Sequence, residues 1–204
     1  MRLYHAPASP FVRKVMILLH EAGAADRVAL VPAAGTPLDP GTMPIDRNPL
    51  GKIPALERDD GPTLYDSRVI CRYLDDTLQA GLYPPAPHLW ETLVLEATAD
   101  GIADAAVLMR YEEHVRPKAA QSPEWVEAQW TKVTRALTTI EGRWISHLAG
   151  PLDMGQIALG AALGYLDFRQ PHRDWRGNRP ALAGWWDEFA KRPALLATQP
   201  GQPA

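Results

Sequence analysis

The spacing of hydrophobic residues changes from strand-like to helix-like and back within the first 31 residues. Residues 2–5 indicate a short strand, and the apolar residues between Phe11 and Ala22 then recur at intervals that place them on one face of a helix. Residues 27–31 indicate a second strand. Because a strand, a helix and a strand of these lengths favour a right-handed crossover between parallel strands, the pattern predicts a βαβ unit.

A hairpin and a second helix are expected after a loop rich in proline and glycine. Residues 53–57 and 63–65 are strand-like and flank the segment 58–61, whose Asp-Gly pair favours an antiparallel hairpin. Asp66 and Ser67 then offer an N-cap to a helix whose apolar residues share one face. The predicted order is therefore βαβ followed by ββα.

The chain beyond the first 80 residues has helical patterns only. Clustered prolines in residues 81–87 predict a stiff linker, because proline stops helices on both sides. We expect helices over 89–114, 123–147, 154–167 and 181–191, and no strand. Asp153 and Gln156 have the spacing of a capping box at the third of these helices. A second, all-helical domain should begin near residue 85.

Composition and charge narrow the classes of function. Hydrophobic residues make up 46% of the 204 residues and charged residues 22%, which is typical of globular proteins with a packed core. The formal net charge of −3, with acidic and basic residues interspersed, gives no concentrated basic surface for a nucleic acid. Residues 1–7 contain no apolar run long enough for a signal peptide, and nowhere in the sequence do about 18 uncharged apolar residues follow one another. We expect a cytoplasmic protein that binds neither nucleic acid nor membrane.

Thiol and metal chemistry from the chain itself are not expected. Cys71 is the only cysteine, so neither a disulfide within the chain nor a two-cysteine redox pair can form. Its position on a predicted helix indicates a small core residue. The six histidines form no i, i+3 or i, i+4 pair on a helix, so we expect no metal site. Any thiol must therefore come from a ligand.

Ser9 and Pro10 mark both a helix start and a candidate anion site. A serine oxygen accepts from free backbone amides, and proline suits the first helical position. Amides and the helix dipole favour negative charge at this end, and the hydroxyl can donate a hydrogen bond to a thiolate. A plain helix cap is the alternative interpretation of Ser9.

Two later features suit an extended ligand with an amino-acid end. A cis bond between Ile53 and Pro54 would turn the Ile53 amide and carbonyl outward, free to pair with a peptide as a strand edge does. A trans proline in a loop is the alternative. Asp66 and Ser67, at a helix start, can hold an amino group and a carboxylate, and this role is compatible with capping.

Together these motifs resemble the glutathione transferase family. The matching segments are Tyr4 with residues 9–14, residues 48–56, and Asp66-Ser67 with Ile70, Tyr73 and Leu74; beyond the linker, residues 153–158 and Trp185 with Arg192-Pro193 also match. The resemblance implies an α/β thioredoxin-like domain over residues 1–80, with a βαβ-ββα order and a mixed four-stranded sheet. It implies an all-α helical-bundle domain over residues 87–204.

The family also implies a role for each matching position. Ser9 would contact the glutathione sulfur, Ile53 beside a cis Pro54 would bind the cysteinyl backbone, Asp66 and Ser67 would hold the γ-glutamyl group, and Lys52 would meet the glycyl carboxylate. Tyr4 is the rival for the sulfur contact. Glutathione would be a cosubstrate, and the protein would be a homodimer.

The implied activity is conjugation of the glutathione thiolate to a small hydrophobic electrophile, as in detoxification. Cysteine-dependent reductase chemistry is not expected, because no cysteine stands near Ser9. Residues 6–10 also lack the serine- and cysteine-rich loop of the family's maleylacetoacetate isomerases. The alternative is a protein of the same fold that binds glutathione or another protein with little catalysis.

The first helix after the linker should border the electrophile. Asp100, Asp104, Val107 and Tyr111 share one face at helical spacing, whereas Trp90, Val94, Ala97, Gly101 and Leu108 form the expected core stripe. We expect Val107 and Tyr111 to touch the electrophile. Asp100 or Asp104 would reach the amino group of glutathione across a dimer, or else remain solvated.

Overall fold

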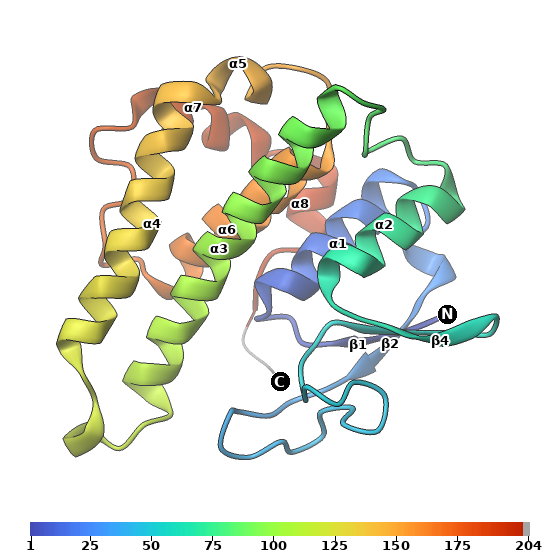
Figure 1. Ribbon diagram of the computed structural model, residues 1–204, viewed down its shortest axis with the longest axis horizontal. Coiled ribbons are helices and arrows are strands. Elements are labelled where there is room, and N and C mark those ends of the chain that lie inside the picture. The colour runs from blue at the N-terminus through green and yellow to red at the C-terminus, as the bar shows by residue number, and fades with distance from the viewer. Residues whose placement is uncertain (202–204) are drawn as a thin grey trace. The chain divides into compact units, whose positions relative to one another are not determined.

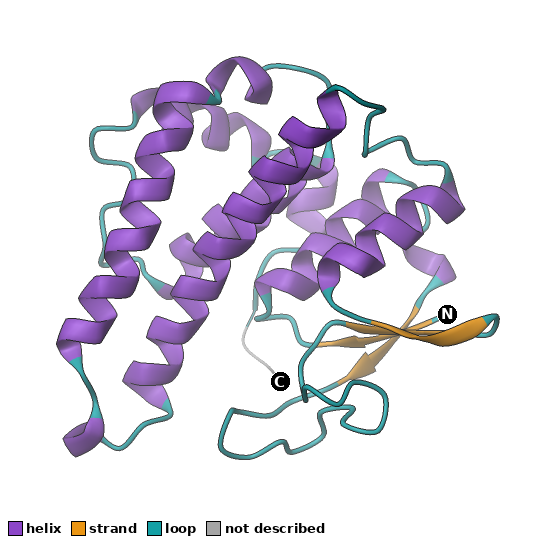
Figure 2. Cartoon of the chain, viewed as in Figure 1, coloured by secondary structure: helices purple, strands orange, loops and turns teal. Residues whose placement is uncertain are grey.

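The computed structural model describes residues 1–201, which form two compact units (Figures 1 and 2). One unit comprises Met1–Pro84 together with residues 193–201, and the other comprises Pro85–Arg192. No helix in the described residues is long and apolar enough to span a membrane.

The first unit is built on a mixed sheet with strand order β2-β1-β3-β4. Its strands are β1 (Arg2–His5), β2 (Ala29–Pro32), β3 (Ala55–Arg58) and β4 (Gly61–Leu64). β1 runs parallel to β2 and antiparallel to β3, and β4 is antiparallel to β3. The predicted βαβ-ββα order and the mixed four-stranded sheet are therefore confirmed.

Two helices, α1 (Pro10–Glu21) and α2 (Ser67–Leu78), lie side by side against the sheet (Figure 1). The fully buried side chains of this unit include Leu3, Val15, Leu18, Leu19, Leu56, Ile70, Cys71 and Leu74. Cys71 is thus the core residue expected from the sequence. Because side chains alternate along a strand, Arg2 and Tyr4 project from the face of β1 opposite to Leu3. A short 3₁₀ helix, η1 (Ala25–Arg27), precedes β2.

The second unit is helical throughout. Its elements are α3 (His88–His114), η2 (Lys118–Ala120), α4 (Pro123–Arg143), α5 (Ile145–Leu148), α6 (Met154–Arg169) and α7 (Pro180–Phe189). α3 packs against both α6 and α4. Every residue of α6 from its first position to Leu166 is buried, so α6 is the central helix of this unit. The predicted all-helical second domain is confirmed as a fold.

The capping box at the start of α6 is present and joins three helices. The Asp153 side chain accepts from the Gln156 amide at 3.0 Å, and the Gln156 side chain accepts from the Asp153 amide at 3.1 Å. Asp153 Oδ2 also accepts from Thr92 Oγ1 of α3 at 2.6 Å and from His147 Nε2 of α5 at 2.8 Å. The cap is therefore also a tertiary contact.

Apart from shifts of one or two residues at the ends of α3, α6 and α7, the helices differ from the sequence prediction in two places. The predicted helix 123–147 is interrupted at Trp144, where α4 ends and α5 begins. A further helix, α8 (Pro193–Ala197), was not predicted and packs against α1. Its Leu195 carbonyl accepts a buried hydrogen bond from Arg13 Nη2 at 3.2 Å. The predicted domain ranges, 1–80 and 87–204, remain a prediction, but α8 belongs with the first unit because it buries Ala194 and Leu195 there.

The expected core stripe of α3 is wrong. Trp90, Val94 and Leu108 are 62%, 54% and 42% exposed, and Ala97 and Gly101 are exposed as well. The buried face instead carries Leu95, Ala99, Ile102, Ala106 and Met109. Apolar residues lie on two faces of this helix, so periodicity alone does not tell which face meets α6.

Candidate functional site

The sheet register brings the three sequence motifs of the first unit to one edge. Tyr4 is paired with Ala55, so the chain leaving β1 toward Ser9 runs beside Ile53 and Pro54, which precede β3. Leu64 is paired with Leu56, so the chain leaving β4 toward Asp66 emerges at the same edge. Residues from three separate stretches of sequence thereby converge.

Ser9 caps α1 and keeps its hydroxyl proton available. It is the N-cap residue with Pro10 at the first helical position, as predicted, and its Oγ accepts from the Val12 amide at 3.3 Å. The side chain is half-buried, and its hydroxyl donates no hydrogen bond within residues 1–201. Capping uses a lone pair on the oxygen, whereas an anion would use the proton, so the two interpretations of Ser9 are compatible.

The Phe11 amide adds a second donor at this helix end. Pro10 has no N–H, and the Val12 and Arg13 amides are bonded to Ser9. The Phe11 amide has no acceptor in the part of the chain that the structure describes. One hydroxyl and one amide, at the positive end of a helix dipole, can therefore point to one anion.

Tyr4 is engaged elsewhere. Its hydroxyl donates to Glu57 Oε1 at 3.0 Å. Burial and this contact with the Glu57 carboxylate raise the pKa of Tyr4. The same carboxylate pairs with Arg47 at 2.9 Å and with Arg2 at 3.2 Å. The only proton of the phenol is thus used in a network on the outer face of the sheet.

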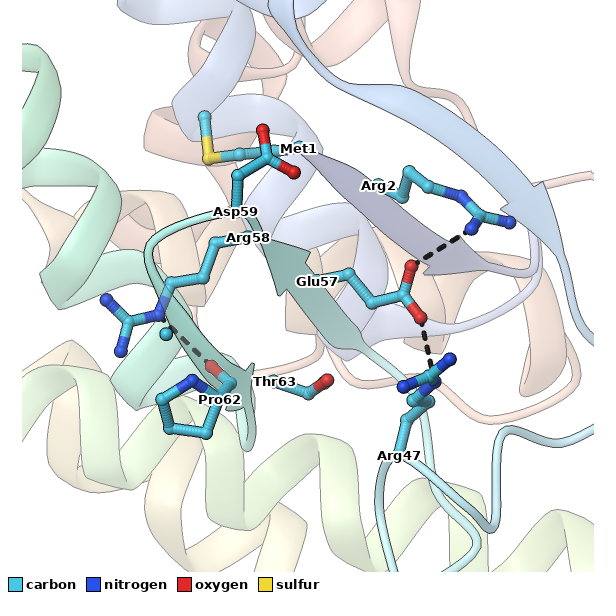
Figure 3. A pocket seen from close by; sticks show the side chains of 9 residues that line it. Met1, Arg2, Arg47, Glu57, Arg58, Asp59, Pro62 and Thr63 are labelled. Atoms are coloured by element: carbon cyan, nitrogen blue, oxygen red, sulfur yellow. Dashed lines mark hydrogen bonds and ion pairs between the residues drawn. The ribbon is translucent and has the colours of Figure 1, made fainter.

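Figure 3 shows the hollow beside this network, of about 370 Å³. It is lined by Met1, Arg2, Arg47, Glu57, Arg58, Asp59, Gly61, Pro62 and Thr63. Arg2 and Arg47 point to the Glu57 carboxylate, and Arg58 turns away from them to donate to the Pro62 carbonyl at 3.1 Å. None of the glutathione-contact residues suggested by the sequence lines this hollow.

The segment before β3 presents the Ile53 backbone. The Ile53–Pro54 peptide bond is cis, as the resemblance implies, and Pro54 is buried. The buried Asn48 side chain fixes the preceding loop, because its Nδ2 donates to the Lys52 carbonyl at 2.8 Å. Neither the amide nor the carbonyl of Ile53 has a backbone partner in the described chain. The Lys52 side chain is exposed.

Asp66 and Ser67 stand at the start of α2. Asp66 is the N-cap, and its Oδ1 accepts from the Arg68 amide at 3.0 Å. Its side chain is exposed, whereas Ser67 is buried. The Tyr65–Asp66 bond is also cis. The exposed carboxylate can accept a charged donor such as an ammonium group while it caps the helix.

On α3, Val107 and Tyr111 are half-buried, Asp104 is exposed and Asp100 is only 4% exposed. Burial raises the pKa of Tyr111. The interpretation of Asp100 as a solvated carboxylate is therefore wrong.

The structure groups Tyr111 with polar residues that sequence reasoning missed. Tyr165 and Arg169 of α6 and Arg110 of α3 are near enough for their charges to interact. Burial raises the pKa of Tyr165 to about 12, and the two arginines offset part of that rise. The i, i+4 spacing of Tyr165 and Arg169 was a usable signal, but their proximity to α3 requires the tertiary fold.

No group of three His, Cys, Asp or Glu side chains placed to hold a metal ion occurs among residues 1–201.

Comparison with known proteins identifies the family. Residues 8–77 match the model of the glutathione S-transferase N-terminal domain, and residues 123–188 match that of the C-terminal domain. An uncharacterized GST-like protein of Escherichia coli K12, YibF, is 32% identical over 98% of both chains.

A glutathione transferase family member from Pseudomonas fluorescens Pf-5, solved with bound glutathione, is 46% identical over 98% of both chains with a TM-score of 0.94. A second structure of a family member from this strain holds S-(propanoic acid)-glutathione, at 45% identity and a TM-score of 0.90, over 98% of this chain and 100% of that one. These likenesses extend over nearly the whole length of the protein. The chain belongs to the glutathione S-transferase family.

Proposed function

We propose that this protein is a glutathione transferase that joins the glutathione thiolate to a small electrophile. The observation that carries the proposal is the convergence of Ser9, Ile53 and Asp66 at one edge of the sheet. Each brings a different recognition group there: a hydroxyl, an unpaired backbone segment and an exposed carboxylate. A tripeptide with a thiol and an amino-acid end fits this set.

Each part of glutathione has a proposed partner. Ser9 donates to the sulfur, the Ile53 backbone pairs with the cysteinyl backbone beside Pro54, and Lys52 meets the glycyl carboxylate. The γ-glutamyl amino group pairs with Asp66, and its carboxylate meets the α2 end at Ser67. The engagement of Tyr4 with Glu57 favours Ser9 for the sulfur contact.

The magnitudes are sufficient for thiolate stabilisation. Lowering a thiol pKa from about 8.5 by two units requires about 2.7 kcal/mol in favour of the charged form. A hydrogen bond to a charged group contributes about 1.5–3 kcal/mol, and a helix terminus adds about 0.3–1 kcal/mol. The Ser9 hydroxyl and the end of α1 together supply this amount.

The reaction needs no covalent enzyme intermediate. The thiolate attacks the electrophilic carbon, a carbon–sulfur bond forms, and the displaced electron pair leaves with a departing group or takes a proton. Presenting the thiolate at neutral pH and holding both reactants together lower the barrier. The relatives with bound glutathione and with S-(propanoic acid)-glutathione support a site for glutathione and for its thioethers.

The helical unit is proposed to bind the electrophile through Val107 and Tyr111. Both are half-buried on one face of α3, which suits an apolar ligand. We place the activity in the cytoplasm, with removal of reactive compounds as its role.

A homodimer is proposed from the exposed stripe of α3. Trp90, Val94 and Leu108 are large apolar side chains in solvent, with Ala97 and Gly101 between them. The stripe follows alternating steps of four and three residues over its first three turns, which is the spacing of a helix that packs against another helix. A second copy of the chain would cover it.

Replacement of Ser9 by alanine tests the function. Turnover of an aryl halide with glutathione at neutral pH should fall about 10- to 100-fold through the lost hydrogen bond to the thiolate. Glutathione affinity, measured by calorimetry, should change little. The control is Ser122→Ala, which removes another serine N-cap, at α4, far along the chain from the site. If turnover is unchanged in Ser9→Ala, Ser9 serves only as a helix cap. If the native protein binds glutathione but shows no turnover, the alternative of a glutathione-binding protein with little catalysis is favoured.

A further inference from the structure

His5, the last residue of β1, lies at the edge of the sheet where the proposed glutathione contacts converge. Its carbonyl accepts from the Ala33 amide at 2.9 Å, which fixes its backbone. In the antiparallel register with β3, Tyr4 is paired with Ala55, so one further step places His5 level with Pro54. His5 therefore stands beside the cis proline of the candidate site.

The chain turns directly after His5 and brings Ser9 back toward it. The Ser9 amide donates to the Ala6 carbonyl at 3.0 Å, which closes a turn over residues 6–9. The Cα atoms at the two ends of such a turn lie less than about 7 Å apart. Because His5 immediately precedes this turn, His5 and the Ser9 hydroxyl belong to the same small region at the start of α1.

The side chain of His5 projects from the face of the sheet that carries α1. Side chains alternate along a strand, so His5 shares its face with Leu3, which is fully buried beneath the helices. Tyr4 projects from the opposite face, where its hydroxyl donates to Glu57. The imidazole of His5, and not the Tyr4 phenol, is therefore on the side of the sheet where Ser9 begins α1.

The imidazole of His5 is half-buried and has no hydrogen-bond partner within residues 1–201. The residues level with it on the two neighbouring strands are prolines, which offer no polar side chain. Burial lowers the pKa of His5 below the usual 6.5, and no charged group in the described chain adds to this effect, including Arg13 and Lys14 of α1 and Asp66 at the start of α2. At pH 7 the ring is therefore mostly neutral, and one of its nitrogens can accept a proton.

We propose that His5 is the general base that takes the proton from the glutathione thiol. This role rests on the proposed conjugation and adds the residue that receives the proton. The Ser9 hydroxyl stabilises the thiolate by donating a hydrogen bond to it, but a hydroxyl is not a base near neutral pH. A neutral imidazole is the side chain best suited to accept a proton at this pH. Ser9 and His5 thus divide the task between a donor to the anion and an acceptor for the proton.

The proton moves from sulfur to nitrogen and then to water. When the S–H bond breaks, its electron pair stays on the sulfur and the proton moves to the imidazole of His5. The negative charge of the thiolate favours the charged ring and so raises the pKa of His5 in the complex, which keeps the proton in the site. With an aryl halide, the sulfur bonds to the ring carbon, the halide leaves with its electron pair, and His5 releases its proton to water.

The pH dependence of turnover tests this role in the full-length protein. In His5→Gln, kcat/KM for glutathione with an aryl halide should fall about 10-fold or more at about pH 6.5, because the amide takes no proton. The loss should shrink toward about pH 8.5, where the thiol ionises without a base. The control is His172→Gln, an exposed histidine in a turn of the helical unit, which should keep the native profile. A loss that is equal at every pH would make His5 structural and overturn the proposal, as would an unchanged profile.

A binding test needs neither turnover nor a variant that folds. Ultraviolet absorbance shows whether bound glutathione is a thiolate, and calorimetry at pH 7 in buffers of different ionisation enthalpy counts the protons released, with S-methylglutathione as the ligand that lacks a thiol. If His5 keeps the proton, glutathione should form the thiolate and release no more protons than S-methylglutathione. Release of about one further proton per thiolate formed overturns the proposal, and so does binding without a thiolate. Absence of turnover would reject the proposed conjugation, whereas this comparison would still decide the role of His5.

Discussion

Asp153→Ala should destabilise the helical unit far more than the loss of an ordinary helix cap. Asp153 is buried and accepts from the Gln156 amide, the Thr92 hydroxyl and His147 Nε2 at 3.0, 2.6 and 2.8 Å. The cap contributes about 1 kcal/mol, and each hydrogen bond to the charged group about 1.5–3 kcal/mol. Since such terms are not additive, we expect a loss of about 3–5 kcal/mol, the range for breaking a buried charged contact.

Tryptophan fluorescence in urea measures this effect directly. All seven tryptophans lie between residues 90 and 186, so the signal follows the helical unit. With a slope of about 2–3 kcal/mol per molar urea, the midpoint should fall by about 1–2 M. Ser122→Ala removes an N-cap whose Oγ accepts from the Trp125 amide at 3.2 Å, its one hydrogen-bond partner within residues 1–201, and should cost about 1 kcal/mol. If Asp153→Ala costs no more than this control, the contacts to Thr92 and His147 contribute nothing and the reasoning is refuted.

Three further predictions concern binding, assembly and pH. Asp66→Asn should weaken glutathione binding about 10-fold by removing the charge opposite the amino group, and equal affinity by calorimetry would remove Asp66 from the site. Val94→Asp should give monomers in analytical ultracentrifugation; an unchanged sedimentation coefficient would place any dimer contact elsewhere. Burial opposes ionisation of Asp167, but hydrogen bonds from Arg176, Trp175 and Trp186 hold its pKa below the usual value. The contribution of ionised Asp167 to the free energy of unfolding is therefore fully present above the pKa of the unfolded state, about 3.9, and is lost as pH falls through the lower pKa of the folded state. The loss of stability caused by Asp167→Asn should therefore shrink between pH 7 and pH 3.

Local signals in the sequence predicted much of the fold. The Ser9-Pro10 helix start, the Asp-Gly hairpin and the capping box of Asp153 each depend on a few neighbouring residues, and all three are present. The residues of the candidate site were also predicted from local signals, as three short motifs. Their convergence required the strand register, which no single motif contains.

Features that depend on tertiary contacts could not be predicted. Apolar residues lie on two faces of α3, so the pattern alone could not tell that Trp90 and Val94 face solvent. The bond between Tyr4 and Glu57 joins residues on different strands. The proximity of Arg110 and Arg169 likewise depends on how α3 and α6 pack, because each arginine alone looks like a solvated helix residue.

The return of α8 to α1 makes the first unit discontinuous in the gene. The chain leaves this unit after Pro84 and comes back at Pro193, where Leu195 receives the Arg13 hydrogen bond. A gene segment that encodes residues 1–84 alone therefore lacks α8, which is part of this unit. Recombination between relatives at the linker would pair one parent's α1 with the other parent's α8, so exchange of this module requires two crossovers, one in each connection.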